Sequence, residues 1–587
     1  MYRSNVKMIK NRNMKKLSVY ILFPVILLVF LSSCQKVGVK INTELTPDVF
    51  PQTSAQFISV LGPAYASLRG NFALDYWFMQ SLSSDEAILP ARGGNWYDPG
   101  NGYNHMHLHD WTSTNGWTNS TWSWLSKVIG ASNQAISILN TTMPAGAAKQ
   151  SSIAEITIVR DLAYFMQMDL YGSVPIDTVY GNLTPPANVA RTQVFSFIES
   201  DIKSVLPYLS TGAGTLMYGR ANKYTAYALL AKMYLNAEYY TGTARYNDCV
   251  AACDSVINAG GGSQYALEPA ATYLQMFYPT NGPSQKEFVF AIPYDPSAGI
   301  YSGTNGFLYR ARYDLNRNLG IKYRYSGSTA GTVTDPVMNA TYTGAGLVNS
   351  QPSGPESTLK SFYNYFYDSN DVRDKQWLVG LQYWQDGKPL MVQTTKGGTL
   401  GYDATYTASD KGAAYVYQLN ITPDIYYRTD PNSGANPALF DLGNDEISWN
   451  MGIRNIKFLA DYTNASNRNQ NNDVPVFRYS DIILMKAEAI LRGAAATQGQ
   501  TALGLANQLR AARTSSPAWT NITLDSIYNE RSREFTWETW HRNDMIRFGK
   551  FEGSWGFKTD ADPNHRIFPI PSTALGLNPA LKQNPGY

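Results

Sequence analysis

Apolar and small residues recur at three-, four- and seven-residue spacing in several segments of the chain. Between residues 219 and 240, Ala221, Ala228, Ala231 and Leu235 follow this spacing, which places them on one face of an α-helix. Small residues on such a face allow a neighbouring helix to approach closely. The same pattern predicts helices at 153–170, 191–209, 478–492 and 501–513.

A long irregular region lies between these helical blocks, at about 260–470. It is rich in Gly, Ser, Asn and Tyr, as in the run SGTNG at 302–306. Loops this long are functional or disordered, and dense aromatic residues argue against disorder. We therefore predict a mainly α fold in a single domain, with a helical scaffold at 51–260 and 475–550 that presents long irregular loops. The alanine-spaced helices resemble tetratricopeptide-like helix pairs, but no repeat period is evident.

The first 33 residues have the pattern of an export signal. Lys15 and Lys16 precede an apolar run from Leu17 to Leu31, which is too short to span a bilayer comfortably and contains Pro24. Translation can start at Met1 or at Met14, and the sequence does not decide between them.

The run ends in the sequence LSSC at 31–34, which resembles the lipobox of bacterial lipoproteins. In such proteins the thiol of the cysteine, here Cys34, is acylated, for example with palmitate, and the cysteine becomes the first residue of the mature protein. Acyl chains anchor a protein to a membrane at ~0.8 kcal/mol per buried methylene. The alternative is an ordinary secretory signal with an incidental cysteine. We predict a signal peptide at 1–33, an acylated Cys34 with a tether at 34–50, and a folded domain at 51–587.

Charge and composition favour a neutral polar ligand. Residues 1–33 carry six basic residues and no acid, so their removal changes the net charge from +3 to −3. A mildly acidic body gives no electrostatic basis for binding nucleic acid. The chain has 41 Tyr, 23 Phe and 13 Trp, while only 16% of its residues are charged. Cys249 and Cys253 lie four residues apart in a predicted helix, and we interpret them as small core residues.

Several motifs, in order along the chain, resemble the SusD/RagB family of nutrient-binding outer-membrane lipoproteins. They cover nearly the whole mature chain and lie at 160–175 (RDLAYFMQMDLYGSVP), 219–231, 477–489, 530–547, 569–571 and 583–587. The spacing of Glu530, Arg533, Glu534, Glu538 and Arg542 predicts ion pairs on one helix face, at ~0.2–0.5 kcal/mol each. The pair Tyr171-Gly172 followed by Val174-Pro175 predicts a helix end. We expect these motifs to be structural and to lie outside the binding site.

The resemblance implies a single SusD-like helical domain that sits as a lid over a SusC-like TonB-dependent transporter. The lid would capture a glycan, or in some family members a peptide, and deliver it for import. It would face the cell exterior from the outer membrane, although Gln35 and Lys36 depart from the acidic run that some surface-exported relatives carry after the cysteine. We expect no cofactor and assign no metal ligands, and the sequence does not show whether Ca²⁺ or another ion steadies a loop. An interaction protein that only plugs the transporter is a further alternative.

A glycan site needs flat aromatic side chains beside hydrogen-bonding groups, because sugar rings have apolar C–H faces edged by hydroxyls. Residues 84–124 hold Trp96, Trp111, Trp117, Trp122 and Trp124, of which Trp122 and Trp124 precede a helical run and are expected in the core. Turn-forming residues predict a loop at 93–103. By resemblance, Trp96 and Tyr97 in this loop are candidate ligand-binding residues, with polar partners Asn95, Asp98 and Asn101. A second candidate set is Tyr309, Tyr313 and Tyr323.

Enzymatic and metal chemistry has weaker support. His105, His107 and His109 alternate as on one face of a strand and could bind a metal, but we favour a polar strand face. The main enzymatic alternative is a glycoside hydrolase, in which Asp85, Glu86 or Asp98 would supply one of two catalytic carboxylates. The sequence contains no zinc-protease motif, serine-nucleophile elbow or phosphate loop. We therefore expect a binding protein rather than an enzyme.

Overall fold

Long helices form where the sequence shows small and apolar residues at helical spacing. In the computed structural model, α7 (Ala147–Tyr171) covers the predicted segment 153–170 and α8 (Arg191–Val205) covers most of 191–209. The other three segments become α9 (Lys223–Leu235), α15 (Tyr479–Leu491) and α16 (Ala502–Ala511). The predicted mainly α-helical fold is therefore confirmed.

The structure describes residues 50–92, 102–294, 332–334, 341–343, 356–382, 391–394, 415–418, 420–429, 431–443, 446–458 and 471–587. The chain divides into two units, Met1–Gln52 and Thr53–Tyr587, and the elements below belong to the second. Its remaining α-helices are α2 (Ser54–Ser59), α3 (Gly62–Asn71), α4 (Trp77–Ser81), α5 (Tyr103–Leu108), α6 (Gly116–Thr142), α10 (Ala237–Thr241), α11 (Tyr246–Ile257), α13 (Lys360–Tyr363), α14 (Glu446–Asn450), α17 (Leu524–Glu534), α18 (His541–Arg547) and α19 (Ser572–Leu577). Short 3-10 or π turns are η1 (Phe72–Tyr76), η3 (Leu206–Tyr208), η4 (Ala259–Gly262), η5 (Leu274–Phe277), η8 (Val372–Gln376), η10 (Pro431–Ser433), η11 (Pro437–Leu439) and η13 (Pro563–Arg566).

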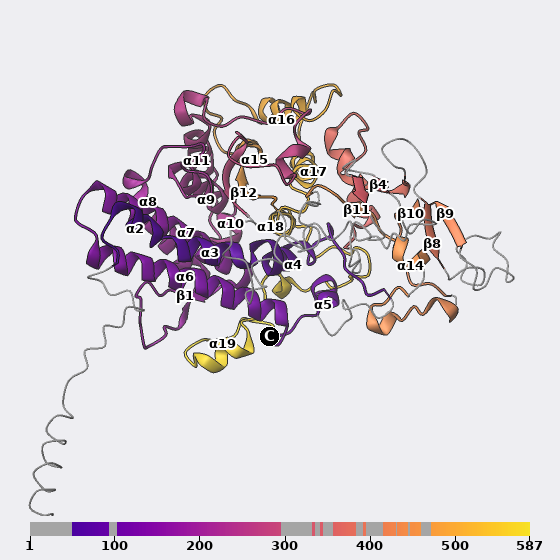
Figure 1. The fold of residues 1–587 in the computed structure, drawn as a ribbon, viewed down its shortest axis with the longest axis horizontal. Helices are drawn as coiled ribbons and strands as arrows, with labels where there is room; N and C mark the ends of the chain where they lie inside the picture. The colour runs from indigo at the N-terminus through magenta and orange to yellow at the C-terminus, as the bar shows by residue number, and fades with distance from the viewer. Residues whose placement is uncertain are drawn as a thin grey trace, which may run out of the picture. The chain divides into compact units, whose positions relative to one another are not determined.

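The helical scaffold is built from helices that pack on one another, some of them neighbours in sequence and others from opposite sides of the loop-rich region. Helix α6 lies along α7, and α7 packs against α8 (Figure 1). Helix α9 packs on α11, which in turn contacts α15, and α15 packs against α16 and α17. Ala228 and Ala231 of α9 are fully buried, as the small-residue pattern requires for close helix contact. Cys249 and Cys253 are buried free thiols of α11, which confirms their interpretation as core residues.

Helix α7 ends where the sequence predicts. Gly172 follows Tyr171 with φ +72°, and its N–H donates to the carbonyl of Met168. A positive φ is accessible to glycine at low cost, so Gly172 allows the chain to leave the helix. Val174 and Pro175 then form strand β1 (Val174–Pro175).

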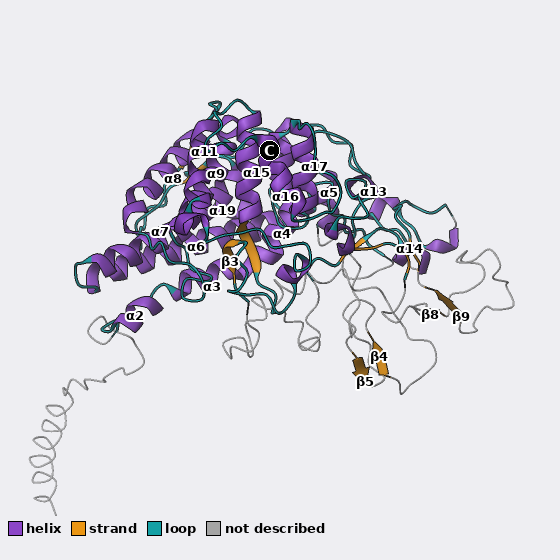
Figure 2. Cartoon of the chain, turned by 90° about the horizontal axis from the view of Figure 1, so that it is seen from above, coloured by secondary structure: helices purple, strands orange, loops and turns teal. Residues whose placement is uncertain are grey.

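The strands of the described residues form antiparallel pairs and no larger sheet. The pairs are β1 with β2 (Asn188–Val189), β3 (Phe288–Ile292) with β12 (Val474–Arg478), β4 (Thr332–Thr334) with β5 (Thr341–Thr343), β6 (Trp377–Leu378) with β11 (Arg454–Asn455), β7 (Gly380–Leu381) with β10 (Asn420–Ile421), and β8 (Met391–Thr394) with β9 (Tyr415–Gln418). All residues of β3 and β12 are buried, and Phe288 lies opposite Arg478. Figure 2 shows β3 next to the helices, with the pairs β4–β5 and β8–β9 set apart from them.

The single helix expected at 530–547 is wrong. Helix α17 ends at Glu534, α18 begins at His541, and Trp537 and Thr539 between them have positive φ values of 60° and 70°. The aromatic rings of Phe535, Trp537 and Trp540 are buried here, so the chain turns to place them in the core. Glu538 and Arg542 therefore do not share a helix face with Glu530 and Glu534.

Within the part of the chain that the structure describes, no helix has both the length and the apolar character needed to cross a bilayer. The apolar run 17–31 and Cys34 lie outside the described residues.

Candidate functional site

The residues proposed to bind a ligand lie outside the described part of the chain. These are Asn95, Trp96, Tyr97, Asp98 and Asn101 in the first loop, and Tyr309, Tyr313 and Tyr323 in the second. The structure does, however, describe both ends of the first loop, and each end is held by buried contacts.

The loop 93–101 begins from a buried anchor. Ala91 donates its N–H to the carbonyl of Phe440 at 3.0 Å and accepts from the N–H of Leu442 at 3.0 Å. The next residue, Arg92, is fully buried, and its guanidinium donates to Ser357 Oγ and to the Met451 carbonyl, each at 3.1 Å. Burial lowers the pKa of Arg92, because the charged guanidinium loses its hydration in the interior. These contacts fix the point from which the loop departs.

The described chain resumes after this predicted loop at Gly102, which has φ +76°. A Cβ atom at this position would lie 2.9 Å from Nδ2 of Asn115, so only glycine fits without a shift. Asn115 in turn caps α6, because its Oδ1 accepts the N–H groups of Trp117 and Thr118 at 3.0 and 3.3 Å. The Tyr103 ring packs on Trp117 at 4.9 Å between ring centres. Both ends of the loop are thus attached to well-packed structure.

The described tryptophans of the region 84–124 belong to the packing of the fold. Trp122 and Trp124 are buried, as expected, and Trp124 donates its indole N–H to the carbonyl of Ser67 at 2.7 Å. Trp111 is also buried, and its indole N–H donates to Tyr587 at 2.7 Å. Trp117 is half-buried against Phe78 at 4.8 Å. Of the five tryptophans in this region, only Trp96, which lies outside the described residues, remains a candidate for binding a ligand.

The strand expected for the three histidines is wrong, because His105 and His107 lie in α5 and His109 follows it. His107 and His109 are buried, and His105 is partly exposed beside Asp110 at 2.7 Å. Burial lowers the pKa of His107 to about 4 and also lowers that of His109, so both are neutral at pH 7. No cluster of three His, Cys, Asp or Glu side chains that could hold a metal ion occurs among the described residues.

The carboxylates considered for glycoside hydrolysis are engaged in the interior. Glu86 is fully buried, and its carboxylate accepts the backbone N–H of Trp537 at 2.9 Å. Asp85 lies 2.5 Å from Nε2 of the buried His541. A hydrolase needs both carboxylates to face a cleft that admits the sugar. Glu86 cannot meet this requirement, and Asp98 lies outside the described residues.

An aromatic cluster that the sequence analysis missed adjoins the anchor of loop 93–101. Phe557 contacts both Tyr427, at 4.6 Å between ring centres, and Phe440, at 5.4 Å. Burial, together with the nearby Asp441, raises the pKa of Tyr427 to about 12. The neighbouring Tyr426 is 51% exposed. Ile425 and Tyr427 are less exposed than Tyr426 between them. This alternation is the signal in the sequence from which the aromatic cluster could have been predicted.

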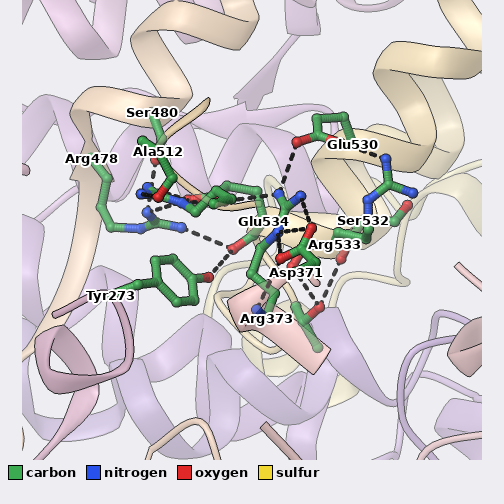
Figure 3. A network of polar contacts seen from close by, with 12 residues as sticks. Tyr273, Asp371, Arg373, Arg478, Ser480, Ala512, Glu530, Ser532, Arg533 and Glu534 are labelled. Atoms are coloured by element: carbon green, nitrogen blue, oxygen red, sulfur yellow. Dashed lines mark hydrogen bonds and ion pairs between the residues drawn. The ribbon is translucent and has the colours of Figure 1, made fainter. Parts of the chain in front are cut away.

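Two of the family-like motifs, those at 477–489 and 530–547, contribute side chains to a buried ionic network (Figure 3). Its centre is Glu534 of α17, which lies within 3.0 Å of Arg373, Arg478 and Arg513. All four side chains are almost completely excluded from solvent. The network has equal numbers of cations and carboxylates: Arg373, Lys457, Arg478, Arg513 and Arg533 with Glu287, Asp371, Glu530, Glu534 and Glu538.

The network joins the loop-rich region to the helical scaffold. Arg373 comes from η8 in the loop-rich region, and it pairs with Glu530 of α17 at 2.9 Å. Burial alone would raise the pKa of Glu530, but Arg373 and Arg533 lower it to about 2. Lys457 pairs with Glu538 at 2.5 Å, and burial lowers its pKa to about 8. Every charge here is paired inside the fold, so the network positions the loops and leaves no group for a ligand.

Two sequence profiles and two curated relatives match this chain. The sequence profile of the "SusD family" matches residues 228–587, and a second profile, described as "Starch-binding associating with outer membrane", matches residues 78–235. A curated relative, "Starch-binding protein SusD" of Bacteroides thetaiotaomicron, is 24% identical over 452 residues, which are 74% of this chain and 72% of the relative. A "SusD-like protein" of Bacteroides ovatus is 28% identical over 166 residues, covering 27% of this chain and 30% of that protein.

Solved structures show the same fold. A "Laminarin binding SusD-like protein" superposes with a TM-score of 0.63 at 19% identity, covering 92% of this chain and 100% of the other. "Surface glycan-binding protein A" of Bacteroides thetaiotaomicron, in complex with laminarihexaose, gives a TM-score of 0.63 at 18% identity and covers 91% of this chain and 100% of the other.

Proposed function

Because the chain belongs to the SusD family, we propose that it is a cell-surface lipoprotein that captures neutral oligosaccharides and passes them, unmodified, to a SusC-like TonB-dependent transporter. The observation that carries the proposal is the agreement of fold and sequence with sugar-binding relatives. The curated relative is named for starch binding, and the structural neighbours are named for laminarin and glycan binding.

The proposed binding residues are the rings of Trp96 and Tyr97, with Asn95, Asp98 and Asn101 as hydrogen-bonding partners. Flat rings stack on the C–H faces of sugars and contribute ~0.5–1.5 kcal/mol each beyond the area they bury. The buried anchors at Arg92 and Gly102 support this choice, since a loop held at both ends loses less entropy when it binds. Tyr309, Tyr313 and Tyr323 are proposed as a second set of contacts.

The proposed anchor is an acylated Cys34 in the outer membrane, with the folded domain facing the cell exterior. A surface position would place the captured sugar at the mouth of the transporter. The second sequence profile supports the location, because its description names association with the outer membrane.

Native affinity electrophoresis of the mature protein in gels that contain starch, laminarin, arabinoxylan or galactomannan tests the proposal. We expect retardation by at least one glycan, with no shortening of the glycan after prolonged incubation. Trp96→Ala should weaken the retardation about two- to tenfold, which corresponds to the loss of one stacking contact. Tyr180→Ala, which removes a half-exposed tyrosine elsewhere, is the matched control.

Three results would contradict glycan capture. Retention of casein peptides but of no glycan would select a peptide-binding protein instead. Shortening of the glycan by the wild-type protein would indicate a hydrolase. Binding of neither class would favour a protein that only plugs the transporter.

A further inference from the structure

Tyr367 has the most exposed aromatic side chain among the described residues, with 70% of its surface open to solvent. One face of its ring nevertheless lies against a fixed cation, since Cζ of Arg533 is 5.3 Å from the ring centre. Arg533 is buried, donates to the carbonyl of Tyr365 at 3.0 Å and pairs with Glu530. The ring of Tyr367 is therefore supported from the inside while its other face remains open.

Trp519 repeats this arrangement on a neighbouring segment. Cζ of the buried Arg510 lies 4.4 Å from the centre of the Trp519 ring, which remains partly exposed. The backbone of Trp519 is fixed by Asn507, whose Oδ1 accepts its N–H at 2.8 Å and whose Nδ2 donates to its carbonyl at 2.9 Å. Cation–π contacts of this kind contribute ~0.5–1 kcal/mol at exposed sites and limit the motion of the ring.

A polar cluster ties together the two segments that carry these rings. Asp368, next to Tyr367, accepts hydrogen bonds from the hydroxyls of Thr514 and Ser516, each at 2.8 Å. Asn370 donates from Nδ2 to Ser516 Oγ at 3.2 Å, and Ser516 lies three residues before Trp519. These contacts fix the segments relative to each other, so the arrangement exists before any ligand arrives.

The charges in this cluster are compensated. Arg533 is paired with Glu530, and the positive charge of Arg510 stabilises the ionised carboxylate of Asp368. Burial works to raise the pKa of Asp368, but hydrogen bonds from Ser516, Thr514 and Asn370 lower it, so the carboxylate is ionised and already satisfied. What the cluster offers a ligand is therefore neutral: two ring faces, hydroxyl groups and the side-chain amide of Asn370.

We propose that Tyr367 and Trp519, with Asn370 and Ser516, form a second binding surface for a neutral oligosaccharide, distinct from the predicted loop sites. Sugar rings have apolar faces that stack on aromatic side chains and hydroxyl edges that hydrogen-bond to amides and hydroxyls. The other exposed tyrosines of the described chain, Tyr180, Tyr208 and Tyr426, have no described cation against the ring. The buried cation behind Tyr367 distinguishes it from these other exposed tyrosines.

Affinity electrophoresis and calorimetry on the mature protein test this second surface. The probe is the hexasaccharide of whichever panel glycan (starch, laminarin, arabinoxylan or galactomannan) retards the protein most. Tyr367→Ala should weaken retardation about two- to tenfold, and Trp519→Phe, which keeps a ring of different size, should weaken it less. Tyr208→Ala, which removes another exposed tyrosine, should behave like the wild type.

The variant Trp96→Ala separates this inference from the proposed function. We expect Trp96→Ala to retain binding that weakens about two- to tenfold further when Tyr367→Ala is added, and the wild type to bind two hexasaccharides per chain. If Trp96→Ala abolishes all binding and Tyr367→Ala changes nothing, the second surface is refuted while glycan capture stands. If the wild type binds no glycan of the panel, both are refuted. Unchanged thermal unfolding of Tyr367→Ala would show that the fold is intact, as its 70% exposure leads us to expect.

Discussion

At the scale of single residues, burial decides which candidate groups are available for chemistry. Glu86 was considered, with Asp85 and Asp98, as one of the two carboxylates that a glycoside hydrolase would need. In the folded chain Glu86 is fully buried, and this burial raises its pKa to about 7. His541, Ser81 and the backbone N–H of Trp537 oppose the rise in pKa. A sequence cannot reveal this, because burial depends on contacts such as the one with Trp537, 451 residues away.

The raised pKa of Glu86 gives a pH-dependent prediction. Its ordinary pKa is 4.5, so the folded protein holds this proton more tightly than the unfolded chain, and stability falls as pH rises from about 4.5 to 7. Glu86→Gln mimics the protonated form and removes this loss. We expect the variant to exceed the wild type in unfolding free energy by up to about 3 kcal/mol at pH 8 and to match it near pH 4.

Urea unfolding of both proteins at pH 4 and pH 8 checks this prediction. A difference between variant and wild type that does not change with pH would contradict it. The same variant tests the hydrolase alternative, since glycan turnover by the wild type that Glu86→Gln abolishes would indicate hydrolysis.

The predictions for the cysteines and the histidines also depended on whether local sequence determines the environment of a residue. Cys249 and Cys253 could be assigned to the core because two small residues on one helix face have no partner of their own in the sequence. The three histidines could not be placed, because alternate spacing suits a strand as well as a short helix such as α5. Tyr367 went unnoticed because the cation that supports its ring, Arg533, lies 166 residues away in sequence.

At the scale of elements, helices with a clear period and a clear end were predictable. Helix α7 and its glycine cap follow from local sequence, since small residues and Gly172 act within a few positions of one another. The break between α17 and α18 was not predictable in this way. Residues 530–547 carry charges at helical spacing, but Glu538 turns away to meet Lys457 and Arg478, which lie far off in sequence.

The buried ionic network predicts a large effect from removing one of its cations. Arg513 is fully buried and lies 2.9 Å from both Glu287 and Glu534. Arg513→Ala leaves two buried carboxylates undercompensated, so we expect a loss of about 3–5 kcal/mol in unfolding free energy. Lys360→Ala, which breaks the exposed pair with Asp424, is the control and should cost less than about 1 kcal/mol.

Guanidinium-induced unfolding, followed by circular dichroism, measures both variants. Equal and small losses would mean that the network does not hold the loop-rich region to the helices. We also expect Arg513→Ala to weaken glycan binding, because Arg373 in the same network belongs to the segment η8 that follows Tyr367.

At the scale of the whole molecule, the fold was foreseen more completely than the binding surface. The order of family-like motifs along the chain indicated the helical architecture, and the buried network joins two of these motifs, 477–489 and 530–547. The candidate rings of loop 93–101 rest on composition and resemblance, while the anchors of that loop at Ala91, Arg92 and Gly102 required the fold.

Membrane anchoring is a property of the whole chain and gives a further prediction. Cys34→Ser removes the thiol that the acyl chain would need, so the variant should lose palmitate labelling and appear in the soluble fraction. Cys253→Ser, in which the replaced thiol is buried in α11, is the control and should label like the wild type. Labelling of Cys34→Ser at the wild-type level would contradict the proposed anchor.

The account as a whole depends on the display of aromatic rings to a sugar by a rigid helical scaffold. The most direct measurement is a crystal structure of the protein bound to the tightest-binding oligosaccharide of the glycan panel. The account predicts intact sugar rings stacked on aromatic faces, with Trp96 or Tyr97 among the contacts. A sugar bound through polar groups alone, with no aromatic ring against it, would contradict the account.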